Sequence, residues 1–83
     1  MNPLQEIANV VKDDWYSIDD MAMVVANIFM QYGLLPKKAV PEDIELLLVE
    51  LAECGFLHYK GDPITEVRVA PHYIPKQGEA HGR

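Results

Sequence analysis

The chain has 83 residues, 49% of them hydrophobic and 24% charged, a composition that favours a folded domain with a modest core over a disordered segment. Asp and Glu number 13 against 7 Lys and Arg, and the resulting net charge of −6 disfavours binding to phosphate backbones and anionic lipid surfaces. A single cysteine, Cys54, excludes a disulfide within the chain.

The N-terminal region shows no basic start followed by an apolar segment, so no signal peptide is predicted. The longest apolar run, residues 21–30, contains Asn27 and has about half the length of a membrane-spanning helix. We therefore expect a cytoplasmic protein that does not associate with membranes.

Two helices are predicted in the first part of the chain. Asn2 suits the N-cap of the first helix and Pro3 its first position, and the apolar spacing continues to about residue 14. A break at residues 15–16 follows, after which Ser17 caps a second helix that Gly33 ends. The predicted inward face of this helix comprises Ile18, Met21, Ala22, Val25, Ile28, Phe29 and Tyr32.

The other side of the second helix is also rich in apolar residues, namely Met23, Val24 and Met30. A helix that is apolar almost all round is either buried on several sides or docked against another chain. Small domains often complete their core by dimerising, so we expect a homodimer or another protein partner at this surface.

A third helix is predicted after a loop over residues 34–40. Pro41 suits its first turn, acidic residues follow at the positive end of the helix dipole, and Gly55 ends it. Leu47 and Leu51 lie in the middle of its apolar face, and they are predicted to be the deepest core residues.

The C-terminal part of the chain predicts a hairpin. Residues 56–60 and 64–69 have the pattern of strands, and a turn at residues 61–63 joins them. The polar, glycine-containing stretch 76–83 is predicted to be a flexible tail, which leaves one domain over residues 1–75. The predicted fold is α+β, with three helices followed by a two-stranded antiparallel hairpin.

This order of elements resembles the winged helix-turn-helix superfamily over residues 17–69. The Ile18-Asp19-Asp20-Met21-Ala22 segment resembles the start of that family's second helix, and residues 44–57 resemble its third helix entering the wing. The resemblance implies that the third helix enters the DNA major groove and that the turn at residues 61–63 is the wing tip.

The exposed positions of the third helix do not have the chemistry of a DNA-reading helix. They are all acidic, and they are Glu42, Asp43, Glu45, Glu50 and Glu53. Phosphates repel carboxylates and attract cations. These residues therefore form either a solvated outer face or a docking surface for a basic protein. Four basic residues near the loop and wing provide the alternative DNA contacts: Lys37, Lys38, Lys60 and Arg68.

No residue pattern predicts catalysis, a cofactor or a metal site. Cys54, His58 and His72 lack the paired short spacings of a zinc site, and Cys54 is expected to be a small buried residue. The Asp13-Asp14 and Asp19-Asp20 pairs are better explained by a helix end and a helix start than by paired catalytic carboxylates. Nucleotide-binding and nucleophile-elbow motifs do not occur.

We therefore expect a small, acidic, non-enzymatic interaction module: an adaptor, a regulator or an inhibitor. Its predicted contact residues are the five acidic residues of the third helix together with Leu46, Val49, Met23, Val24 and Met30. The first alternative is a DNA-binding transcription regulator that uses the four basic residues. A further alternative is an inhibitor of phage or plasmid type that occupies the nucleic-acid-binding groove of a host protein.

Overall fold

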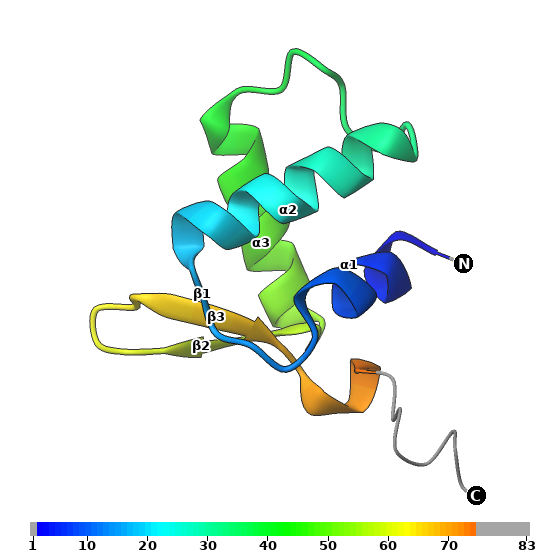
Figure 1. Ribbon diagram of the computed structural model, residues 1–83. Coiled ribbons are helices and arrows are strands. Elements are labelled where there is room, and N and C mark those ends of the chain that lie inside the picture. The colour runs from blue at the N-terminus through cyan, green and yellow to red at the C-terminus, as the bar shows by residue number, and fades with distance from the viewer. Residues whose placement is uncertain (1, 75–83) are drawn as a thin grey trace, which may run out of the picture.

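The computed structural model describes residues 2–74, which form three α-helices and a three-stranded antiparallel sheet (Figure 1). In chain order the elements are α1 (Pro3–Val11), β1 (Tyr16–Ser17), α2 (Ile18–Gln31), α3 (Pro41–Glu53), β2 (Leu57–Lys60), β3 (Glu66–Val69) and a short 3-10 helix (Pro71–Tyr73). The predicted α+β class is confirmed. The predicted element order was incomplete, because it lacked the strand between α1 and α2.

The first two helices begin where their capping residues predict. The Asn2 side chain accepts a hydrogen bond from the Gln5 amide at 2.8 Å, and the Ser17 hydroxyl accepts one from the Asp20 amide at 3.1 Å. The first helix is shorter than predicted and ends at Val11, because the next residue, Lys12, leaves the helical region with a φ of 52°.

Two glycines end the second and third helices as predicted. Gly33 and Gly55 adopt φ values of 72° and 89°, a left-handed conformation that glycine adopts without a steric penalty. After Gly55, the Phe56 amide donates to the Leu51 carbonyl oxygen at 2.9 Å. This bond turns the chain directly from α3 into β2.

The sheet has the order β1-β3-β2, with β3 in the centre. Tyr16 pairs with Val67 and Ser17 pairs with Glu66, so the predicted break at residues 15–16 is wrong at its second residue. Two residues are too few to show the alternation typical of a strand, and this strand forms because β3 supplies its hydrogen-bonding partner. The predicted hairpin is present, although both of its strands begin later than expected.

The helices cover one face of the sheet (Figure 1). Alternation along β3 points Val67 and Val69 into the core, while Glu66 and Arg68 lie on the opposite, outer face. The described core is entirely apolar and draws on every α-helix: Ile7, Ala8, Val11, Met21, Val25, Ile28, Leu48, Leu51, Phe56, Leu57, Val67 and Val69.

Three predictions of burial are wrong. Leu47 is half-buried at the edge of the core, and its neighbour Leu48 is buried instead, together with the correctly predicted Leu51. Tyr32 is exposed, and its hydroxyl donates to a Glu6 carboxylate oxygen at 2.7 Å. Cys54 is also exposed. Adjacent helical positions point about 100° apart, so the rotation of a helix about its axis decides which of two neighbouring side chains is buried.

The predicted tail over residues 76–83, and with it the predicted domain boundary after residue 75, lies outside the described residues. Within residues 2–74, no helix combines the length and the apolar character needed to cross a membrane.

Candidate functional site

The outward side of α3 is the most distinctive surface of the described structure. Leu48 and Leu51 hold the opposite side of the helix in the core, so helical periodicity directs the intervening residues to solvent. Leu46 and Val49 lie three residues apart on this outward side, with 61% and 46% of their surfaces exposed. Both predicted contact residues therefore lie together on one exposed face.

Four exposed glutamates surround this apolar pair, and we call them the acidic ring: Glu42, Glu45, Glu50 and Glu53. Glu42 and Glu53 extend the line of Leu46 and Val49 at its two ends, because the spacing is i, i+4, i+7, i+11. Glu45 and Glu50 flank the pair on either side. We call the acidic ring together with Leu46 and Val49 the α3 face.

The α3 face contains no basic residue, since Pro41–Glu53 has no Lys, Arg or His. An apolar centre inside a polar rim is the usual anatomy of a protein-protein interface. In this case the rim has a single sign of charge. The predicted acidic residue Asp43 is also exposed and lies beside Glu50 at the edge of the face.

A groove lies between α3 and the hairpin, with a volume of about 310 Å³. Its walls are Ile18, Leu48, Val49, Tyr59 and Ile64, and Glu45 is at its edge. The Tyr59 hydroxyl donates to the Leu48 carbonyl oxygen at 3.3 Å. Burial raises the pKa of the Tyr59 phenol above its ordinary value of 10.0, so at neutral pH this wall carries no charge.

A second groove, of about 460 Å³, lies on the other side of α3, toward the loop that joins it to α2. Phe29, Leu34, Leu35 and Leu47 form its apolar wall, and Leu46 borders it. The ridge of Leu46 and Val49 therefore has an apolar groove on each side.

The three predicted contact residues of α2 do not join the α3 face. Met23 is 63% exposed, and Met30 borders a different groove, lined also by Asn27, Gln31 and Lys37. Val24 is half-buried and packs against the core. Within the described residues, the sequence-predicted contact set thus separates into a face on α3 and a face on α2.

The four predicted basic residues do not form a single rim. Lys37 and Lys38 lie in the loop before α3, whereas Lys60 and Arg68 lie on the hairpin that follows it. This loop and the hairpin lie at opposite ends of α3 (Figure 1). Helix α3, with 13 residues and a length of roughly 20 Å at 1.5 Å per residue, lies between the two pairs in the chain.

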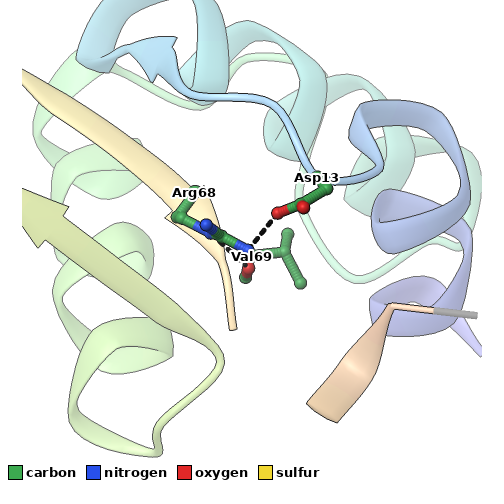
Figure 2. A network of polar contacts seen from close by, with 3 residues as sticks. All are labelled: Asp13, Arg68 and Val69. Atoms are coloured by element: carbon green, nitrogen blue, oxygen red, sulfur yellow. Dashed lines mark hydrogen bonds and ion pairs between the residues drawn. The ribbon is translucent and has the colours of Figure 1, made fainter. Parts of the chain in front are cut away.

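The hairpin cations are also engaged within the chain. Figure 2 shows Arg68 in an ion pair with Asp13, which precedes β1, while its Nε donates to the Val69 carbonyl oxygen at 3.4 Å. Lys60 forms a 2.9 Å ion pair with Glu66, and its Nζ lies 4.5 Å from the centroid of the Trp15 ring. Carboxylates thus neutralise both cations on the outer face of the sheet.

Sequence reasoning did not identify the groove residues Tyr59, Ile64 and Leu34. Their exposure was not predicted, because apolar residues in a strand or after a helix end are normally assigned to the core. Asp19 and Asp20 lie in the first turn of α2, as the prediction of a helix start requires. Among the described residues, no three His, Cys, Asp or Glu side chains are close enough together to bind a metal ion.

Comparisons with known proteins give no indication of ancestry. No protein-family model, curated protein or solved structure shows significant similarity to this chain. The function must therefore be inferred from the geometry and charge of the surfaces described above.

Proposed function

We propose that this chain is a non-enzymatic protein-interaction module that binds a basic partner through the α3 face. The observation that carries the proposal is the acidic ring around Leu46 and Val49 on an exposed, well-anchored helix. A purely solvated helix face has no need of two exposed aliphatic residues at its centre, and these residues add apolar area that a partner can bury.

The charge of the face determines the chemistry of the partner. Four carboxylates within one helix repel acidic surfaces and attract Lys and Arg, which also speeds association at low ionic strength. From Glu42 to Glu53 the face is about 16 Å long, the length of three helical turns. A short segment with bulky apolar residues and flanking Lys or Arg fits these dimensions, with its apolar side chains in the two grooves.

The scaffold supports a role as adaptor, regulator or inhibitor on a winged-helix-like frame. Helix α3 runs directly into the hairpin, in the position that the winged-helix resemblance assigns to the DNA-facing helix. In this chain that position is acidic. A face of this charge also suits the basic groove of a nucleic-acid-binding protein, so inhibition of such a protein is one form that the proposed function can take.

The proposal is tested by selecting peptides that bind the full chain from a random library and measuring their affinity by calorimetry. We expect the selected peptides to combine Lys or Arg with large apolar residues. Leu46→Ala should weaken their binding about 30-fold, as expected for a residue at the centre of an interface. Glu50→Ala should weaken it about two- to fivefold at low salt and less at high salt, because rim charges are screened.

The control for these measurements is His58→Ala, an exposed change on the outer face of the sheet, which should leave the affinity unchanged. Both α3 variants should keep the wild-type melting temperature, because both side chains are exposed. Peptides that are acidic, or whose affinity does not respond to Leu46→Ala, would contradict the proposal.

Affinity for duplex DNA should be weak. The triple change Glu42→Lys, Glu45→Lys and Glu50→Lys brings the net charge from −6 to zero and places cations on the α3 face. We expect it to strengthen DNA binding by at least about tenfold at low salt, through the phosphate term alone. Gel-shift titrations at two salt concentrations measure the change. Tight, sequence-selective binding by the unmodified chain would favour the transcription-regulator alternative.

A further inference from the structure

The two grooves beside α3 share one construction, an apolar wall with carboxylates at its edge. Glu45 borders the groove between α3 and the hairpin, which we call the hairpin-side groove. Asp43 and Glu50 border the groove toward the preceding loop, which we call the loop-side groove. The exposed side chains of Leu46 and Val49 form the ridge between the two grooves.

These three carboxylates have no cationic partner within residues 2–74. The ion pairs in this part of the chain engage Asp13 and Glu66 instead. A carboxylate beside an apolar wall interacts more strongly with a cation than it does in open water, because the local dielectric constant is lower. Each groove also has one aromatic ring in its wall, Tyr59 or Phe29, and the face of such a ring attracts a cation.

Lysine and arginine combine an apolar stem with a cationic end, so they match both parts of each groove. We infer that the partner segment contacts α3 with two basic residues, one in each groove, and with an apolar residue between them that packs on the ridge. This mode of binding rests on the proposed function, because it concerns the same α3 face and the same basic partner.

The geometry of α3 sets the spacing of the two basic residues. Glu45 and Glu50 are five residues apart, which separates them by about 7.5 Å along the helix axis. They flank the ridge on opposite sides, about 10 Å apart across the helix, so their total separation is about 12 Å. Residues i and i+4 of an extended segment lie about 13 Å apart on the same side, and residue i+2 lies midway between them.

An extended partner segment is favoured over a helical one. Five extended residues cross the ridge, whereas a helix needs about eight residues to cover the same distance. Isolated helices shorter than about 12 residues are marginal in water, so a short helical segment would lose affinity to the cost of folding. The expected partner motif is therefore basic–x–apolar–x–basic, in which each x faces away from α3.

The test uses the full chain and the peptides selected from the random library by binding to it. These peptides should be enriched in two Lys or Arg residues four positions apart, with a large apolar residue midway. In the tightest-binding peptide, each basic residue is then replaced in turn by norleucine, which keeps the apolar stem and removes the charge. Calorimetry at low salt should show that each replacement weakens binding to the unmodified chain about fivefold.

Double-mutant cycles identify the carboxylates that each basic residue meets. One norleucine replacement should weaken binding less than about twofold in Glu45→Gln, and the other should do so in the double variant Asp43→Asn with Glu50→Gln. The matched control is Glu42→Gln with Glu53→Gln, which removes charges from α3 that border neither groove. In this control both replacements should still weaken binding about fivefold. Circular dichroism should show the same fold for all variants, because the five side chains are exposed.

Two results would overturn this mode of binding and leave the proposed function standing. The first is a set of peptides that respond to Leu46→Ala but lack a basic pair at this spacing. The second is a norleucine effect that persists in the groove variants or disappears equally in the control. Peptides that do not respond to Leu46→Ala would overturn the proposed function itself, and with it the contact with two basic residues.

Discussion

Replacing Phe56 by Ala is expected to lower the free energy of unfolding by about 3–5 kcal/mol, the range for a buried aromatic residue truncated to a cavity. Phe56 is fully buried at the junction of α3 and β2, and its ring meets that of Tyr73 edge-on, with centroids 4.9 Å apart. A domain of 83 residues holds about 4–12 kcal/mol in total, at 0.05–0.15 kcal/mol per residue. The variant should therefore be marginally folded or unfolded at 37 °C.

Urea denaturation followed by circular dichroism measures this change. Leu46→Ala is the matched control, because it removes a large apolar side chain from an exposed position on the neighbouring helix. We expect that control to alter the free energy of unfolding by less than about 0.5 kcal/mol. If Phe56→Ala unfolded at the same urea concentration as Leu46→Ala, the packing described around this ring would be wrong.

The second large effect distinguishes two adjacent leucines of α3. Leu48→Ala should cost about 2–5 kcal/mol, because Leu48 is buried in the core. Leu47→Ala should cost about 1 kcal/mol, because Leu47 is half-buried and borders the groove on the loop side of α3. The two changes remove the same atoms, so the difference between them reports burial alone.

Thermal denaturation of both variants, at one pH and salt concentration, is sufficient for this comparison. A larger loss of stability in Leu47→Ala than in Leu48→Ala would mean that α3 is rotated about its axis relative to the orientation that buries Leu48. Equal losses of stability would place both side chains at the edge of the core. The orientation of α3 on which the α3 face depends would then be wrong.

These predictions also separate stability from binding on a single helix. Leu48 and Leu51 face the core, whereas Leu46 and Val49 face solvent. Substitutions on the side of α3 that faces the core should unfold the domain and thereby also abolish partner binding. Changes on the outer side should leave the fold intact and weaken partner binding alone. That division allows the α3 face to be tested without the ambiguity of misfolded variants.

Local signals in the sequence were sufficient to place the helices. Asn2, Ser17, Gly33 and Gly55 cap or end their helices through contacts within a few residues, so their effect is visible without knowledge of the fold. The hairpin was predictable for the same reason, because β2 and β3 are joined by a short turn. The acidity of α3 is also a property of the sequence alone, whereas the exposure of its carboxylates was an inference that the structure confirms.

Contacts between distant residues were not predictable in this way. Strand β1 exists because Tyr16 meets Val67, and the Asp13–Arg68 ion pair joins residues 55 positions apart (Figure 2). The Asp13–Arg68 and Lys60–Glu66 ion pairs engage two of the four basic residues that the sequence predicts as alternative DNA contacts. Opposite charges far apart in the chain neutralise each other only once folding brings them together.

The sequence by itself determined the class of this protein: its helices, its hairpin, its acidic third helix and the largely apolar character of its second helix. The tertiary structure decided which side of each helix is exposed to solvent. Leu46 rather than Leu48 faces solvent, and Met23 is exposed while Val24 packs against the core. Helical periodicity restricts each residue to a direction about the helix axis, but the docking of the helices on one another and on the sheet decides which direction is the outside.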